Sequence, residues 1–262
     1  STEIDLSSPF MINTETGIYT ATFDATDTPK KIRLNRLSPS LENLWSQTGV
    51  SLTPQNDQRN AYLVDLGENG VACFWSESRS FIDGFDIYFQ AIDINGDIQL
   101  DAGGVIAAQS NGDDYIKEII STPDGHYLIF WVEEIWPASR LKFNKIDQNG
   151  NTANDWPPGG YSLSNQSVEA NNISVKKISD SDGVLAVWNE DGNVSDVYAQ
   201  KINWDGVAQW ENFGIPICIS DNDQSAISFD IDGDGSYAFI SWEDYRNGTD
   251  YNIIGKEIDI NS

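Results

Sequence analysis

Four glutamates recur along the chain, each one or two residues after a tryptophan that closes an apolar run. The runs are ACFW-SES, LIFW-VEE, LAVW-NED and FISW-EDY, and the glutamates are Glu77, Glu133, Glu190 and Glu243. Carboxylates at equivalent strand ends could hold a divalent cation or cleave a glycosidic bond, with one carboxyl as general acid and another as nucleophile or base. Because catalysis needs carboxyls with separated pKa values, an acid repeated in every unit is more typical of scaffolding.

A fifth, weaker copy of the pattern, YTATF-DAT, places Asp24 after a phenylalanine. Arginines follow two of the repeated glutamates. Across one hairpin, Arg79 could pair with Asp86 and Arg246 with Asp250. We therefore expect each repeated acid to be paired inside its own unit. Catalysis would instead require two or three acids to converge in an open channel without arginine partners.

A second acidic pattern is typical of calcium loops. Asp230, Asp232 and Asp234 in DIDGDG have alternating oxygen ligands, although Ser241 stands where an EF-hand loop would have glutamate. The alternative is a hairpin turn with an extra Asp-Gly. Calcium at these aspartates is the metal site that the sequence favours.

Other residue types that could do chemistry are scarce. The one histidine, His126, follows a Pro-Asp-Gly turn, so we expect a polar surface residue and no nucleophile–histidine triad. The two cysteines, Cys73 and Cys218, occupy different places in the repeat and are expected to be buried free thiols. Trp136 in EEIWPASR has no equivalent in other units. An exposed aromatic on a rigid loop can stack on a sugar ring, so Trp136 is the predicted ligand-binding residue.

The overall charge excludes some partners. The net charge is −26, from 41 acidic and 15 basic residues. Nucleic-acid binding depends on Lys and Arg displacing counterions, and anionic membrane surfaces attract cations, so both partners are disfavoured. No apolar run approaches the roughly 18 residues of a membrane span. The acidity is typical of a protein that stays soluble when secreted or in a salt-rich setting. The more specific alternative is that the acidic surface binds divalent cations.

The elements that must position these residues are predicted to be short strands. Each unit contains four segments rich in β-branched and aromatic residues, bounded by Gly, Asp or Asn; the fourth unit reads NNISVKKISDSDG, VLAVWNEDGNVS, DVYAQKINWDG and VAQWENFGIPICIS. Four strands in about 50 residues are the signature of a β-propeller blade. The sequence predicts one all-β domain over residues 1–262, a five-bladed β-propeller with four antiparallel strands per blade.

The ends of the chain predict a closed ring. The blades span approximately residues 13–60, 61–114, 115–170, 171–225 and 226–262. The last unit stops at IDINS without an outer strand, and EIDLSSPFMI at the N-terminus resembles DIQLDAGGVIAA. We therefore expect residues 1–12 to complete the last blade, which would remove an exposed edge. The alternative is a linear solenoid or an open array continued by another molecule.

Several motifs resemble a known group of repeats. FWSESRSFIDGFDIYFQ at 74–90, DVYAQKINWDG at 196–206 and SWEDYRNGTDYNI at 241–253 are similar to the W-x-D-x-R and D-I-Y-x-Q blade repeats of secreted bacterial cell-surface β-propeller proteins. STPDGHYLIFW is more loosely similar to TolB-type propeller repeats. The resemblance implies a propeller that is secreted or on the cell surface, and implies little about activity.

These observations lead to a functional prediction. Because the polar residues repeat and no asymmetric catalytic set stands out, we predict a non-catalytic extracellular binding or surface-structure module for a glycan or protein. The alternative is a glycan-acting enzyme that uses Glu77, Glu133, Glu190 and Glu243 at the channel mouth. A second alternative is a subunit of a surface layer or appendage. Ligand identity and oligomeric state stay open.

Overall fold

The protein is described by a computed structural model in which residues 10–24, 30–46, 48–52, 56–80, 84–153, 156–165 and 169–262 are placed. Within these ranges every regular element is a strand, except for one turn of 3-10 helix, η1 (Gly67–Asn69). The predicted all-β class is confirmed. The placed residues contain no helix that is long and apolar enough to cross a membrane.

The strands form five antiparallel sheets that follow one another along the chain, and each sheet keeps its strands in chain order. The first sheet is β1 (Phe10–Thr14), β2 (Gly17–Asp24), β3 (Lys31–Leu37) and β4 (Val50–Ser51); the second is β5 (Gln58–Asp65), β6 (Val71–Ser80), β7 (Gly84–Ile92) and β8 (Val105–Ala108); the third is β9 (Asp113–Ser121), β10 (Tyr127–Ile135), β11 (Ala138–Ile146) and β12 (Tyr161–Ser162); the fourth is β13 (Glu169–Ser179), β14 (Gly183–Asp191), β15 (Ser195–Ile202) and β16 (Ile215–Cys218); the fifth is β17 (Gln224–Ile231), β18 (Tyr237–Asp244) and β19 (Asn252–Asp259).

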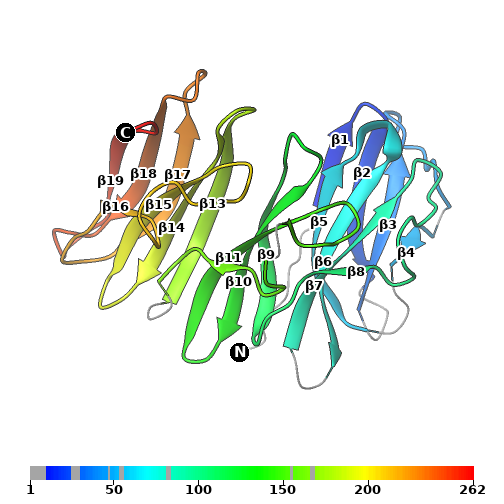
Figure 1. Ribbon diagram of the computed structural model, residues 1–262, viewed down its shortest axis with the longest axis horizontal. Coiled ribbons are helices and arrows are strands. Elements are labelled where there is room, and N and C mark those ends of the chain that lie inside the picture. The colour runs from blue at the N-terminus through cyan, green and yellow to red at the C-terminus, as the bar shows by residue number, and fades with distance from the viewer. Residues whose placement is uncertain are drawn as a thin grey trace.

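The five sheets lie side by side along the longest axis, with the first and the fifth at opposite ends (Figure 1). The sheets are not closed into a ring, so the predicted closure is not seen. Part of that prediction falls on residues 1–9, which lie outside the described residues. Residues 10–12, which we had assigned to the last blade, belong to the first sheet, because Phe10–Thr14 pairs with β2.

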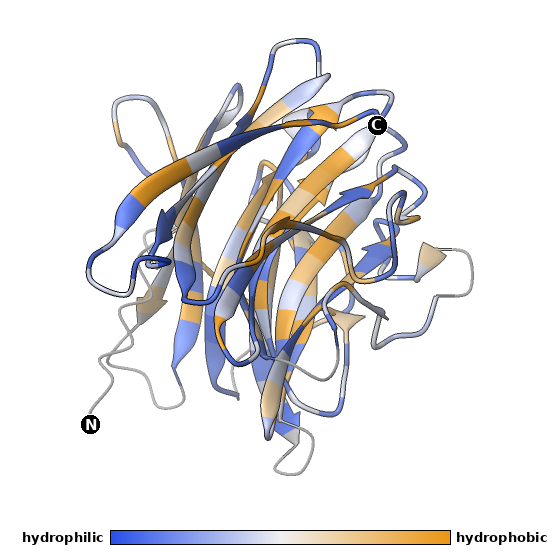
Figure 2. Ribbon diagram, turned by 90° about the vertical axis from the view of Figure 1, so that its left-hand side faces the viewer, coloured by the Kyte–Doolittle hydropathy of each residue, from blue (hydrophilic) through white to orange (hydrophobic). Residues whose placement is uncertain are grey.

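A hydrophobic cluster fills the space between each pair of successive sheets. Apolar and polar residues alternate along the strands, as the banding in Figure 2 shows. The repeated tryptophan of each sheet packs against the sheet before it: Trp75 against the first, Trp131 against the second and Trp188 against the third, all fully buried. Burial of such large rings is the main apolar gain of each interface.

Each of these indole rings packs against a glycine in the loop before the fourth strand of its own sheet. A Cβ on that glycine would lie about 2.5 Å from the six-membered edge of the indole, and its φ is positive. The pairs are Gly104 with Trp75, Gly160 with Trp131, and Gly214 with Trp188. Glycine at this position is therefore required by packing as well as by the turn.

The strand register corrects one sequence assignment. The third strand of each sheet ends at an aliphatic residue that bridges to a residue six positions later, as in Leu37↔Asn43 and Ile92↔Ile98. Aligned on these residues, Thr22 opposite Arg33 takes the place of Trp75 opposite Tyr88. Phe23, predicted to replace the tryptophan, lies one position later and faces the other side of the sheet.

We predict that Gly214→Ala lowers the free energy of unfolding by at least about 1–2 kcal/mol. The new methyl group would sit at φ +80°, 2.5 Å from Trp188 and 2.6 Å from the carbonyl oxygen of Ala199. Urea denaturation followed by tryptophan fluorescence measures the change. Gly233→Ala is the control, since a Cβ there meets nothing within 4 Å. Equal stability of the two variants would contradict the packing argument.

Candidate functional site

Three of the four predicted glutamates occupy the same register position, two residues after the tryptophan on the second strand of a sheet. Glu77, Glu133 and Glu190 are 0%, 3% and 7% exposed. In the fifth sheet this position belongs to Asp244, which is 1% exposed, and not to the predicted Glu243. Glu243 points to the opposite face, because neighbouring residues in a strand alternate. Asp24 also has this register, opposite Lys31, and its side chain is outside the described residues.

In three sheets this carboxylate is part of the scaffold. The indole N–H donates to it: Trp75 to Glu77 at 2.6 Å, Trp188 to Glu190 at 3.2 Å and Trp242 to Asp244 at 2.8 Å. Each carboxylate also accepts a second donor from its own sheet or from the segment that leads into it. These second donors are Arg79 Nε at 3.0 Å for Glu77, the Asn165 amide at 3.0 Å for Glu190, and Arg246 Nε and Nη2, both at 2.6 Å, for Asp244.

The arginines thus pair with the repeated acid itself. Arg79 binds Glu77 and Arg246 binds Asp244, whereas the sequence suggested Asp86 and Asp250 as their partners. The Arg246 hydrogen bonds lower the pKa of Asp244 to about 2. Asp244 is therefore a poor proton donor. Burial instead raises the pKa of Glu190.

The third sheet departs from the repeat. Asp114 on β9 lies directly opposite Glu133 on β10. The other sheets with a described residue at the Asp114 position have no acid there: Gln58 faces Glu77, Ala170 faces Glu190, and Gln224 faces Asp244. Among these sheets, only the third has an acid on its first strand opposite the repeated acid. In the second and fourth sheets the opposing acid is on the third strand, with Asp86 opposite Glu77 and Asp196 opposite Glu190.

The surroundings of Asp114 keep a proton on it. Asp114 is fully buried, and its Oδ1 accepts the Trp131 indole N–H at 2.9 Å and the Ser110 hydroxyl at 2.5 Å. Its Oδ2 has no hydrogen-bond partner among the described residues. Desolvation raises the pKa of Asp114 to about 7, and the negative charges of Glu133 and Asp86 act in the same direction.

Glu133 has a different environment. Lys142 Nζ lies 3.6 Å and Arg140 Nη1 3.9 Å from its Oε2, and the Asn111 amide donates to its Oε1. Lys142 occupies the place that Tyr88 and Tyr198 hold in the second and fourth sheets. The side chains of Arg140 and Lys142 are 31% and 14% exposed, so the cluster reaches solvent through its cations.

One short segment, residues 109–111, touches all three buried acids of this region. Gln109 Nε2 donates to Asp86 at 3.1 Å, the Ser110 hydroxyl donates to Asp114, and the Asn111 amide donates to Glu133 at 3.3 Å. This segment joins β8 of the second sheet to β9 of the third. The acid pair thus lies beneath an inter-sheet connection.

Asp114 and Glu133 meet a condition for acid–base chemistry, because the two carboxyls lie in different environments. Asp114 can carry a proton near neutral pH, while Glu133 is balanced by two cations. Asp114 was not among the predicted catalytic residues, because those acids were chosen for following a tryptophan and Asp114 does not follow one. The available signal lay in the first strands, where QRN, DYI and QSA begin with Gln58, Asp114 and Gln224. The fourth sheet has Ala170 at this position.

Glu118, also on β9, is a second acid with a raised pKa. Burial raises its pKa to about 7, and the Tyr62 hydroxyl donates to its Oε1. No charged group contributes to this shift. Glu118 is therefore a solitary buried acid and not a member of a pair.

The predicted calcium site is not formed among the described residues. Asp230 pairs with Lys176 at 3.0 Å, and the carboxylates of Asp232 and Asp234 accept backbone amides of the β17–β18 turn at 3.0 Å. No cluster of three metal-ligand side chains occurs in the placed ranges. The aspartates point to different partners because they build a hairpin, so the alternative interpretation describes them.

Trp136 lies at the tip of the β10–β11 hairpin and is 93% exposed. Its role in ligand binding stays a prediction. Cys73 is buried and Cys218 half-buried, both as free thiols. His126 Nδ1 lies 3.3 Å from Asp124 Oδ2 at the surface.

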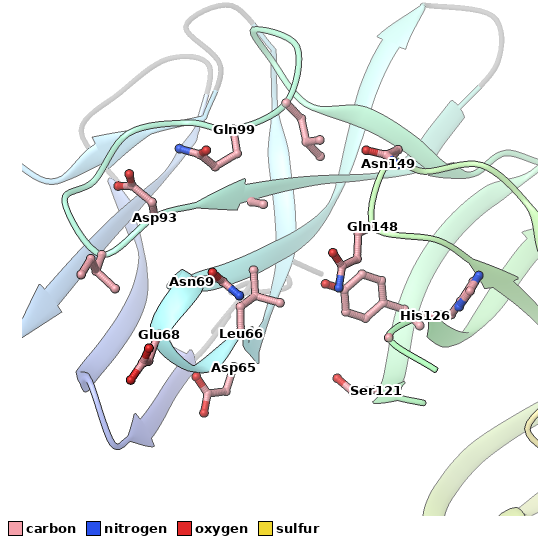
Figure 3. A pocket seen from close by; sticks show the side chains of 15 residues that line it. Asp65, Leu66, Glu68, Asn69, Asp93, Gln99, Ser121, His126, Gln148 and Asn149 are labelled. Carbon is pink, nitrogen blue, oxygen red and sulfur yellow. The ribbon is translucent and has the colours of Figure 1, made fainter. Parts of the chain in front are cut away.

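His126 also lines a cleft of about 640 Å³ between the second and third sheets (Figure 3). Asp65, Glu68 and Asn69 lie on one side, and His126 and Gln148 lie across from them. The cleft includes Ser121 at the end of β9, whereas Asp114 is near the start of that strand. The cleft therefore offers hydrogen-bonding groups away from the acid pair.

Comparison with known proteins gives the fold a context. No protein-family model matches the chain, and no curated protein matches its sequence. Among solved structures, an alpha-L-arabinanase from Penicillium chrysogenum, complexed with arabinobiose, has a TM-score of 0.50 at 11% identity over 97% of this chain and 77% of that chain. An endo-arabinase from Bacteroides thetaiotaomicron has a TM-score of 0.49 at 12% identity, over 98% and 95%. The arabinanases are five-bladed β-propellers, and at these identities the likeness shows the fold alone.

The main functional prediction from the sequence is wrong on this comparison. The solved structure with the TM-score of 0.50 is an arabinanase in complex with arabinobiose, which is a glycan-acting protein and not a non-catalytic module. The premise of that prediction also fails, since Asp114 and Lys142 form an asymmetric charged set in the third sheet. A repeat alignment by tryptophans alone hides such a set.

We predict that Asp114→Asn changes the pH dependence of stability. The folded-state pKa of about 7 exceeds the unfolded value of about 3.9, so the folded state binds more protons between these values and wild-type stability falls as pH rises through this window. Asparagine does not titrate, so the variant should gain stability relative to wild type from about pH 4 to pH 7. Thermal melts at each pH measure the gain. Glu118→Gln is measured beside it, because Glu118 is the second acid whose pKa is raised to about 7. An Asp114→Asn stability curve that runs parallel to the wild-type curve would contradict the pKa assigned to Asp114.

Proposed function

We propose that the protein hydrolyses glycosidic bonds of a polysaccharide, with Asp114 as general acid and Glu133 as its carboxylate partner. The observation that carries the proposal is the cross-strand pairing of these two acids in contrasting environments. Glycoside hydrolases place two carboxyls about 5–9.5 Å apart on either side of the bond that breaks. Directly opposite residues on antiparallel strands have Cβ atoms about 4.5–5.5 Å apart, which is compatible with that separation.

The roles follow from the charges. Protonated Asp114 donates its proton to the glycosidic oxygen as the bond to the anomeric carbon breaks. Glu133 attacks this carbon and forms a covalent glycosyl-enzyme, which is the role of the second carboxylate when the two carboxyls are about 5–5.5 Å apart. The deprotonated Asp114 then takes a proton from the water that releases the sugar from Glu133, so one water is consumed and both carboxyls return to their starting states. Lys142 and Arg140 hold Glu133 in place and balance its charge.

Substrate access requires a local movement. Asp114 is fully buried and Glu133 is 3% exposed. Residues 109–111 bind both acids through Ser110 and Asn111, so this segment has to move aside when a sugar reaches the pair. Such closing segments also exclude water from the reacting groups.

The fold likeness suggests which substrate to test first. The Penicillium chrysogenum structure is an arabinanase, so arabinan is the first candidate polysaccharide. We also propose that the five sheets are five blades of one propeller-type repeat. The acidic surface and the repeats that resemble bacterial surface proteins support a secreted or cell-surface location, which fractionation of producing cells would test.

We predict that Asp114→Asn reduces the hydrolysis rate at least about 100-fold, because general acid catalysis contributes about 10²–10⁴-fold. Reducing-sugar release from arabinan and a panel of neutral polysaccharides measures the rate. Glu190→Gln is the matched control, since Glu190 has the register of Glu133 but faces Ala170 where Glu133 faces Asp114. The proposal fails if no polysaccharide is cleaved by the wild type, or if Asp114→Asn and Glu190→Gln retain equal rates.

A further inference from the structure

A second cavity, of about 510 Å³, lies between the third and fourth sheets, on the side of β11 and β12. Four aromatic rings line it: Phe143, Trp156, Tyr161 and Phe213. Ser162, which also lines it, pairs across the strands with Lys142, the cation beside Glu133. The cavity therefore belongs to the same sheet as the acid pair.

The rings form a concave aromatic surface that is open to solvent. Trp156 and Tyr161 meet edge to face at 4.7 Å, and Phe143 and Trp156 at 5.5 Å. Trp156 is 8% exposed, whereas Tyr161 is 48% and Phe213 is 41% exposed. The buried rings fix the exposed ones, so the surface is formed before any ligand arrives.

Phe213 is held in an unfavourable backbone conformation. Its φ is +66°, and it precedes Gly214, the glycine that contacts Trp188. The second sheet has Gly103, with φ +92°, at this position, and the third sheet has Gly159. A β-carbon in the left-handed region costs free energy, and the exposed ring regains little of it through burial. Strain of this kind, at an exposed aromatic, points to a ligand.

The lining of the cavity defines the chemistry of that ligand. Beside the rings it contains the uncharged polar groups of Ser162, Gln200 and Asn212, and no charged side chain. This is unusual for a chain of net charge −26. A site without charge suits a neutral molecule that has both apolar faces and hydroxyl groups, and a sugar ring is such a molecule.

We propose that this cavity binds a neutral sugar unit of a polysaccharide, stacked on Phe213 and Tyr161. The inference deepens the proposed function, on which the polysaccharide identity rests, because it adds a binding subsite apart from Asp114 and Glu133. Phe143 and Trp156 pack with the fourth sheet and Trp131 packs with the second, so the subsite is on the face of the third sheet opposite the acid pair. The predicted residue Trp136 is outside this site.

The test measures binding in the hydrolytically impaired Asp114→Asn background. Neutral oligosaccharides of arabinan, xylan, mannan and β-glucan are titrated by isothermal calorimetry and tryptophan fluorescence. Phe213→Gly introduces the glycine that the second and third sheets have at this position, so it should weaken binding at least 10-fold while the thermal midpoint stays equal or rises. Tyr161→Ala should weaken binding to a similar extent, and Trp136→Ala, the matched exposed aromatic, should leave it unchanged.

Two results would overturn the inference: no neutral oligosaccharide binds at millimolar concentration, or Phe213→Gly binds as well as the parent. Loss of binding in Trp136→Ala alone would move the site to the β10–β11 hairpin and also overturn it. The two proposals can fail separately. If binding depends on Phe213 but the wild type hydrolyses no polysaccharide, the proposed hydrolase activity is wrong and the sugar-binding subsite is still supported.

Discussion

The buried tryptophan between successive sheets is the contact on which the rest of the structure depends. Its ring packs on the preceding sheet, its edge fits against a glycine that has no Cβ, and its N–H is bonded to a buried carboxylate. A buried indole N–H and a buried carboxylate would each be costly alone, and together they satisfy each other. This gives the recurring acids a structural role.

The same contact makes the exception in the third sheet informative. Trp131 donates to Asp114, whereas Trp75 and Trp188 donate to the acid two residues later in their own strand. Glu133 is thereby released from the indole and is balanced by Lys142 and Arg140 instead. One replacement, an acid where glutamine or alanine stands elsewhere, changes a scaffold contact into a pair of carboxyls in different environments.

Sequence analysis predicted the features that depend on local pattern. The strands, their order in each sheet and the equal units followed from apolar runs and turn residues. It failed where register decided the outcome: Phe23 is one position away from the tryptophan site, and Asp244 replaces Glu243. A shift of one residue moves a side chain to the other face, and composition does not reveal such a shift. The pairing of Asp114 with Glu133 depends on two strands and was equally hidden.

Residues that depart from the repeat are the best candidates for function, because the residues that recur in each sheet have a structural role. A residue that recurs in each sheet is accounted for by the sheet, as Glu190 is by its indole and backbone donors. Asp114 and Phe213 do not recur in this way, so the repeat does not explain them. Burial of Asp114 raises its pKa, and Phe213 is strained at φ +66°, so each lowers the stability of the fold at neutral pH. Destabilising residues that the repeat does not require are retained when a ligand or a reaction uses them, and both are found where the third sheet meets one of its neighbours.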